Sequence, residues 1–124
     1  MLTVTKDPDG ENGLINIPIS TICFLQYASH VSRVVVHTEN EEYYLPGTLR
    51  YWIAVLNASG FCFYHAERNA LINVEKVISI DRNFAYIYFN GEAQKRCPVA
   101  FYQIDKTAQN LSVLNSSINI IPAI

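Results

Sequence analysis

In the first 45 residues, turn-forming residues separate short segments in which hydrophobic and polar residues alternate from a longer apolar and aromatic run at 21–28 (TICFLQYA) and a run rich in β-branched residues at 32–38 (SRVVVHT). Turns are predicted at residues 7–10 (DPDG), 29–31 (SHV) and 39–41 (ENE), where polar and turn-forming residues interrupt the pattern. Alternation with a period of two is typical of strands buried on one face. The pattern therefore predicts strands, the later ones joined as hairpins, at residues 2–6, 13–18, 21–28, 32–38 and 42–45.

After Pro46 the hydrophobic residues recur at helical spacing. Thr48 is placed as the N-cap of the predicted helix and Gly60 as its C-terminal stop. One face of this helix would carry Leu49, Trp52, Ile53 and Leu56. A stripe of this kind is usually core packing, so we assign it no functional site.

The strand pattern returns in the second half of the chain. Residues 65–73 are a polar stretch that becomes apolar, and residues 82–83 mark a turn. Asn90-Gly91 between two alternating runs is a strong hairpin signal. Strands are therefore predicted at residues 61–64, 74–81, 85–89 and 93–99.

The C-terminal part combines a second short helix with an uncharged tail. The helix is predicted to start near Ala100, and one of its faces would hold Phe101, Ile104, Ala108 and Leu111. No charged residue follows Lys106, and residues 116–121 (SSINII) have the pattern of a strand. We expect the tail at residues 107–124 to cover the core as an extra strand or to contact a second subunit.

Length and composition indicate one folded domain spanning residues 1–124. Of these 124 residues, 50% are hydrophobic and 16% are charged, which is enough for one core. Cys23, Cys62 and Cys97 are far apart and form no CxxC pair, so we expect buried thiols rather than disulfides or a zinc site. Charges interrupt every apolar run well before ~18 residues, and no signal peptide is recognisable. We therefore expect a soluble, cytoplasmic protein without a membrane segment.

Charge is unevenly distributed along the chain. The formal net charge is −2, whereas a stand-alone nucleic-acid-binding domain usually carries a basic patch. Residues 1–45 contain two basic and six acidic residues, a net charge of −4, and the remainder contains seven basic and five acidic residues, a net charge of +2. The overall charge counts against DNA binding, but the second half can supply a modest positive face.

Few features of the sequence point to catalysis. His30, His37 and His65 do not stand at the spacing of metal ligands, and no glycine-rich phosphate loop is present. The acidic residues at 39–42 are more typical of a solvated hairpin tip than of a paired-carboxylate site. We predict that the protein is not an enzyme and uses no metal or other cofactor.

The most informative motif lies at residues 63–81 (FYHAERNALINVEKVISID). It is similar to the stretch F-x-R-x-H-R-S-Y-L-V-N, followed by I-x-x-I, of the LytTR family of bacterial DNA-binding domains. The residues in register with that stretch are Phe63, Arg68, Leu71, Ile72, Asn73, Val77 and Ile80. The order of elements from residue 21 to about residue 104 also resembles the family, including the run at 97–100 (CPVA). The resemblance implies a mainly β fold: an elongated arrangement of short antiparallel sheets with one or two short helices.

The resemblance also implies three DNA-contacting regions, since family members insert side chains from separate loops into neighbouring grooves. In the first region, where a His-Arg pair is common, this chain has Ser32 and Arg33, with His30 nearby. In the third, an S-R dipeptide is replaced by Ala100 and Phe101. One basic contact is therefore lost.

The second region is the H-R-S turn of the family motif. Here it is Glu67, Arg68 and Asn69, with His65 where an Arg is usual. Arg68 suits a guanine edge or a phosphate, but it could instead pair with Glu67 or Glu75. In the same way, Arg33 could pair with the acids at 39–42, and Asn73 could hold backbone groups at a turn.

Two functions remain open at this point. The first is a small transcription regulator that binds double-stranded DNA sequence-specifically through Arg33, Arg68 and their neighbours, as a homodimer on repeated half-sites. Lys95 and Arg96 would then be the compensating basic residues. The second is a LytTR-derived protein-interaction module that has lost DNA binding, and Glu67, Phe101 and the net charge of −2 favour it. The sequence does not give the DNA target, the direction of regulation or the signal.

Overall fold

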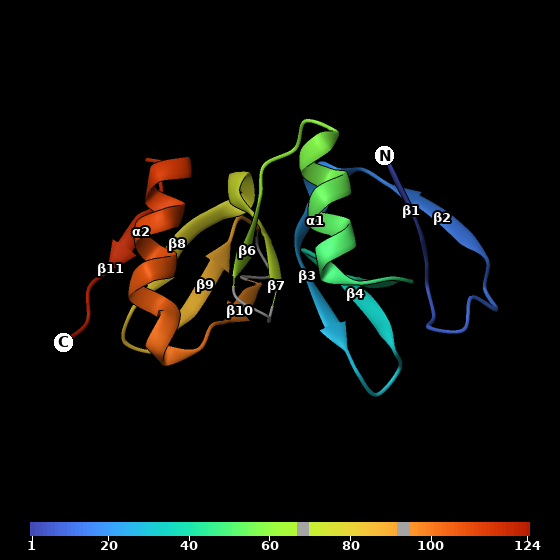
Figure 1. Cartoon of the computed structure of the whole chain (residues 1–124), viewed down its shortest axis with the longest axis horizontal. Coiled ribbons are helices and arrows are strands. Elements are labelled where there is room, and N and C mark those ends of the chain that lie inside the picture. The colour runs from blue at the N-terminus through green and yellow to red at the C-terminus, as the bar shows by residue number, and fades with distance from the viewer. Residues whose placement is uncertain (67–69, 92–94) are drawn as a thin grey trace.

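The described residues form two β-sheets and two α-helices, and the long axis of the molecule is horizontal in Figure 1. The structure is a computed structural model that describes residues 1–66, 70–91 and 95–124. The first sheet contains β1 (Leu2–Thr5), β2 (Leu14–Ile17), β3 (Ile22–Ala28), β4 (Arg33–Thr38), β5 (Glu42–Leu45), β6 (Phe63–Ala66) and β7 (Ala70–Asn73). The second sheet contains β8 (Val77–Asp81), β9 (Tyr86–Phe89), β10 (Arg96–Pro98) and β11 (Asn119–Ile121), and the helices are α1 (Leu49–Ala58) and α2 (Ile104–Leu114).

The strand order is β2-β1-β5-β4-β3-β7-β6 in the first sheet and β10-β9-β8-β11 in the second. The first sheet and α1 occupy one end of the elongated molecule, and the second sheet and α2 occupy the other (Figure 1). The predicted fold class, mainly β with short sheets and one or two short helices, is confirmed. One pairing departs from the antiparallel pattern, because β11 runs parallel to β8.

Strand β3 separates two hydrophobic cores. Ile22 and Leu25 belong to the core on the side of α1, whereas Cys23 and Phe24 belong to the core shared with the second sheet and α2. The pairing of β3 with β4 shifts between Ile22 and Phe24, and this bulge allows the consecutive residues Cys23 and Phe24 to face the same core. Both faces of β3 are therefore buried, which explains its long apolar run.

Helix α1 begins and ends where the sequence predicts. The Thr48 hydroxyl accepts a hydrogen bond from the Tyr51 backbone N–H at 3.1 Å, and Gly60 follows the last turn with φ of +92°. Leu49 and Leu56 are buried in the core on that side of the sheet. The predicted packing role of this apolar face is confirmed.

The strand predicted at residues 74–81 starts only at Val77, because Val74–Lys76 form a 3₁₀ turn. The buried Asn73 precedes this turn, and its side-chain amide donates to the carbonyl oxygen of Ile22 at 2.8 Å. Asn73 thus ties the exit of β7 to the start of β3. This is the backbone-holding role that we considered for it.

The hairpin between β9 and β10 is present, but it does not turn tightly at Asn90-Gly91. The Phe89 N–H donates to the Lys95 carbonyl oxygen, and residues 92–94, which include the predicted start of the strand at 93, lie outside the described residues. The Asn90 N–H donates instead to the Lys76 carbonyl oxygen at 2.7 Å. With Lys95 opposite Phe89, the connection is longer than the two-residue turn that the sequence signal predicted.

Helix α2 starts later than predicted, after a 3₁₀ turn at Phe101–Gln103. Ile104, Ala108 and Leu111 are buried as expected. Phe101 is 69% exposed, so its predicted place on the buried face is wrong. A 3₁₀ turn has three residues per turn rather than 3.6, and it therefore breaks the helical spacing on which that prediction depended.

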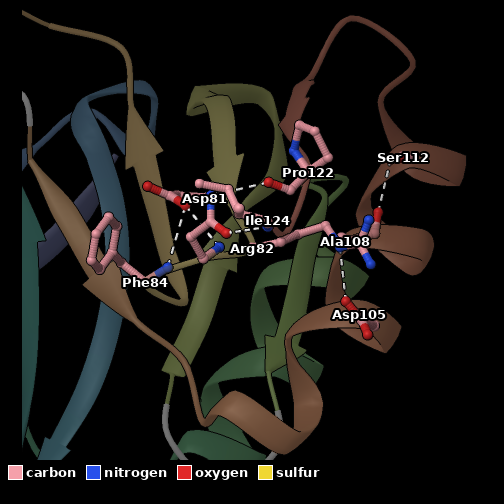
Figure 2. A network of polar contacts seen from close by, with 9 residues as sticks. Asp81, Arg82, Phe84, Asp105, Ala108, Ser112, Pro122 and Ile124 are labelled. Carbon is pink, nitrogen blue, oxygen red and sulfur yellow. Dashed lines mark hydrogen bonds and ion pairs between the residues drawn. The ribbon is translucent and has the colours of Figure 1, made fainter.

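The uncharged tail adds a strand to the edge of the second sheet. Ile118 is buried, β11 pairs with β8, and the Arg82 N–H donates to the Ile121 carbonyl oxygen at 3.0 Å. Figure 2 shows the turn that receives the tail, in which the Arg82 Nε atom lies 2.8 Å from Asp105 on α2. A contact of the tail with a second subunit stays a prediction.

All three cysteines are free thiols. Cys23 and Cys97 are buried as expected, whereas Cys62 is only partly buried. Burial raises the pKa of Cys97 to about 12, which keeps its sulfur protonated at neutral pH. We therefore assign no reactive role to this thiol.

An aromatic stack joins the two sheets. The ring of Phe24 on β3 lies 4.2 Å from the His37 ring on β4 and 5.4 Å from the Phe89 ring on β9. The side chain of His37 is only 13% exposed, and its Nδ1 atom lies 3.7 Å from the Glu42 carboxylate. Burial, with a smaller contribution from the positive charge of Lys95, lowers the pKa of His37 to about 4.

Replacing Asn73 by Ala should lower the free energy of unfolding by about 1–3 kcal/mol, because the buried Ile22 carbonyl would lose its side-chain donor. Urea unfolding followed by circular dichroism measures this change. The matched control is Asn40→Ala at an exposed turn, which should change stability by less than about 0.5 kcal/mol. Equal effects of the two substitutions would contradict the assigned role.

The stability of the fold should fall as the pH is lowered from about 6.5 toward 4, because the unfolded chain takes up a proton at His37 that the folded chain does not. Above about pH 6.5 this contribution is fully present. His37→Phe should flatten the slope, by on the order of 3 kcal/mol at most over this range. Urea unfolding at several pH values tests this, with the exposed His30→Gln as control, and an unchanged slope in His37→Phe would refute it.

Candidate nucleic-acid interface

The turn between β3 and β4 presents two of the predicted contact residues to solvent. His30 and Ser32 are both exposed, and Ser32 has a left-handed backbone conformation with φ of +52°. The Val31 N–H donates to the Ala28 carbonyl oxygen at 3.3 Å, which closes the turn. Arg33 begins β4 directly opposite Ala28. His30, Ser32 and Arg33 are therefore brought together at one end of the first sheet.

Arg33 is held by backbone carbonyl groups rather than by acids. Its Nε atom donates to the Pro8 carbonyl oxygen at 3.0 Å, and Nη1 donates to the Ser32 carbonyl oxygen at 3.0 Å. These bonds use two of the five N–H donors of a guanidinium group. The acids at 39–42 lie beyond the opposite end of β4, so the pairing with them that we considered is not formed.

The residues that flank the second family region lie at the same end of the first sheet. Arg68 and Asn69 are outside the described residues, but Ala66 and Ala70 on either side of them pair across β6 and β7. Ala70 in turn lies opposite Gln26, close to the end of β3 that leads into the β3–β4 turn. The register therefore brings the ends of the two hairpins to one edge.

His65 lies on β6, one position before the end of that strand. It pairs with Leu71, which pairs with Leu25, so its side chain is on the face of the sheet that α1 covers. There it is half-buried and lines an open, mainly apolar pocket together with Tyr27 and Leu49. Its position is close to the hairpin end but partly enclosed.

Lys95 and Arg96 are placed apart from Arg33. Lys95 is near enough to His37 to affect its pKa, and His37 is four residues from Arg33 along β4, or about 13 Å. Arg96 is exposed on β10, with its guanidinium carbon 4.4 Å from the centre of the Tyr86 ring. This cation–π contact holds Arg96 over the outer face of the second sheet.

The third family region exposes aromatic side chains where the family has a basic residue. Phe101 is 69% exposed and Tyr102 is 80% exposed, both between β10 and α2. In Figure 1 this connection, the β3–β4 turn and the β1–β2 loop lie along the lower side of the molecule. The first and third family regions therefore lie along one side of the molecule rather than at one point.

The described ranges 1–66, 70–91 and 95–124 contain neither a metal-binding cluster nor a membrane-spanning helix. Within them, no three His, Cys, Asp or Glu side chains are grouped so that they could bind a metal ion. Nor does any helix in these ranges have the length and hydropathy needed to span a membrane.

A family model of the LytTr DNA-binding domain matches residues 12–112, which is most of the chain. The chain belongs to the LytTR family. Domains of this family are the DNA-binding parts of transcription regulators. The family is one of DNA-binding domains rather than of enzymes. No curated protein sequence matches this LytTR domain.

A solved structure supports the fold of this LytTR domain. It is the LytTr DNA-binding domain of a Bacillus cereus protein described as a methyl-accepting/DNA response regulator. The match has 17% sequence identity and a TM-score of 0.65, and it covers 89% of this chain and 94% of that chain. At this level of identity the match establishes the fold alone.

Two features of the edge were missed by reasoning from the sequence. The exposure of Tyr102 was missed because the helix was predicted to start too early. The contact of Arg33 with Pro8 was missed because it joins residues 25 positions apart. The only signal for this contact was the turn sequence DPDG, which predicts a loop but does not indicate which distant residue the loop contacts.

Phe101→Arg should strengthen binding to duplex DNA, because it restores a basic side chain in the third family region. The slope of log affinity against log salt should steepen by about 0.9 if the new side chain meets one phosphate. Fluorescence anisotropy with a labelled duplex between 50 and 200 mM salt measures both effects. Val113→Arg is the matched control, since Val113 is 83% exposed near the other end of α2. Equal gains in the two variants would contradict a role for this region.

Proposed function

We propose that this LytTR domain binds double-stranded DNA sequence-specifically and acts as a small transcription regulator. The observation that supports this best is the shared edge of the two hairpins, one carrying Arg33 and the other flanking residues 67–69. Strands β4 and β7 lie on either side of β3, about 10 Å apart. This separation is comparable to the major-groove width of about 12 Å, so both hairpins can approach one duplex together.

The proposed contacts divide by chemistry. Arg33 and Arg68 offer planar guanidinium groups, which suit a guanine edge or a phosphate. Arg33 keeps three N–H donors beyond its two bonds to carbonyl groups, and those bonds fix its orientation. The amphoteric side chains of His30, Ser32, His65 and Asn69 would add hydrogen bonds to bases or to the sugar-phosphate backbone.

Lys95 and Arg96 have a supporting role in this proposal. They lie away from the β3–β4 turn, so we assign them a contribution to the positive field and not to base contacts. With a net charge of −2 the electrostatic attraction of one domain is weak. We therefore include a homodimer on repeated half-sites, since joining two weak sites raises the effective concentration of the second.

A second candidate function is protein binding by a domain that has lost its affinity for DNA. The observation in its favour is the exposure of Phe101 and Tyr102 in a region where the family has a basic residue. The second sheet also exposes Ile78 and Phe84. Large exposed apolar side chains are more typical of protein interfaces than of phosphate contacts.

The deciding experiment is a selection from sheared genomic DNA of the host on the purified protein. Binding is carried out at low salt and then near physiological salt, and the retained DNA is sequenced. A repeated motif that survives the higher salt would support sequence-specific regulation. Recovery of no DNA, or of motifless DNA released by modest salt, would refute it and favour the protein-binding function.

Arg68→Ala should abolish or respecify DNA binding while the far-ultraviolet circular dichroism spectrum and the unfolding midpoint stay unchanged. A lost bidentate base contact is worth about 1–3 kcal/mol of discrimination. Arg68→Lys is the informative comparison, because it keeps the charge and loses the planar fork. It should retain binding to random duplex DNA but discriminate less. Unchanged affinity and specificity in both variants would remove Arg68 from the proposed site.

A further inference from the structure

The loop between β1 and β2 is the immediate neighbour of Arg33. The Pro8 carbonyl oxygen accepts a hydrogen bond from Arg33 Nε at 3.0 Å, so residues far apart in sequence meet at the predicted DNA-facing edge. The loop lies on the same lower side of the molecule as the β3–β4 turn (Figure 1). Residues 1–11 precede the segment that the family model matches.

The loop carries three acidic residues with different environments. The Asp7 carboxylate accepts hydrogen bonds from the backbone N–H groups of Glu11 at 2.9 Å and Asn12 at 3.0 Å. These bonds, that of Asn12 first, lower the pKa of Asp7 and show that its charge serves the loop itself. Asp9 and Glu11 are exposed instead, and no hydrogen bond or ion pair of their side chains is found within the described ranges.

The exposed acids lie close to any phosphate that Arg33 would contact. Asp9 follows Pro8 directly, so its Cα atom is about 3.8 Å from that of the residue whose carbonyl holds the guanidinium. Charges separated by less than the Debye length of about 8–10 Å interact with little screening at physiological salt. A carboxylate within that distance of a phosphate would repel the DNA backbone for every base sequence alike.

We propose that the β1–β2 loop is part of the DNA-facing edge, where the Pro8 carbonyl orients Arg33 and the side chains of Asp9 and Glu11 reduce the affinity for DNA. This inference rests on the proposed DNA binding. It separates two properties of the edge: Arg33 contributes to base discrimination, whereas the acidic loop sets the strength of binding. A single domain then binds duplex DNA weakly, and the loop makes occupation of paired half-sites more important.

The test compares two variants that change the net charge equally. The double variant D9N/E11Q removes both loop charges, and the control E41Q/E75Q removes two exposed acids at the opposite end of the first sheet. Each brings the formal net charge from −2 to zero. The dissociation constant for a labelled 30-base-pair duplex of random sequence is measured for the full chain by anisotropy from 50 to 500 mM salt.

We expect D9N/E11Q to bind roughly three- to tenfold more tightly than the wild type at 50 mM salt, with the difference shrinking as salt rises. The control should stay within about twofold, and D9K/E11K should bind more tightly than D9N/E11Q. Equal gains in D9N/E11Q and the control, or no gain in either, would overturn the role of the loop while leaving DNA binding in place. No binding by the wild type or any variant, even at 50 mM salt, would overturn the proposed function and this inference with it.

Discussion

The arrangement of the whole domain depends on the ring of Phe24. It stacks on His37 within the first sheet and on Phe89 in the second, and it projects from a strand whose two faces are both buried. Because β3 is the layer that separates the two cores, its register with β4 and β7 cannot slip without exposing one of them. The same register holds at one edge the two hairpins that are proposed to face DNA. The packing of Phe24 in the interior thereby determines where these hairpin ends lie at the surface.

At that edge the basic Arg33 lies beside an acidic loop, so the described charges there do not form a continuous basic patch. Arg33 is bound to the loop that carries Asp9 and Glu11, while Lys76 lies 3.7 Å from Glu39 on the far side of the sheet. The basic residues are thus dispersed and partly engaged within the described structure. A DNA-binding edge of this kind would depend on a few oriented contacts and on multivalency more than on long-range attraction.

Local rules succeeded where one short segment decides its own structure. Helix α1 begins after Thr48 and ends before Gly60, as predicted. The alternating segments became strands within a few residues of their expected limits. The rules failed where a distant group competes for the backbone. Asn90 bonds Lys76 instead of closing a tight turn, and a 3₁₀ turn moves Phe101 out of the helical spacing.

The sequence by itself determined the strand-rich fold class, the position of α1 and the family, because period-two alternation, helix caps and the motif at residues 63–81 are local properties. Only the tertiary structure decided which predicted site residues share an edge. It placed His30, Ser32 and Arg33 beside the hairpin end that flanks residues 67–69, moved Lys95 away from them, and set an acidic loop against Arg33. These outcomes depend on strand order and register across distant segments, which a one-dimensional pattern does not contain.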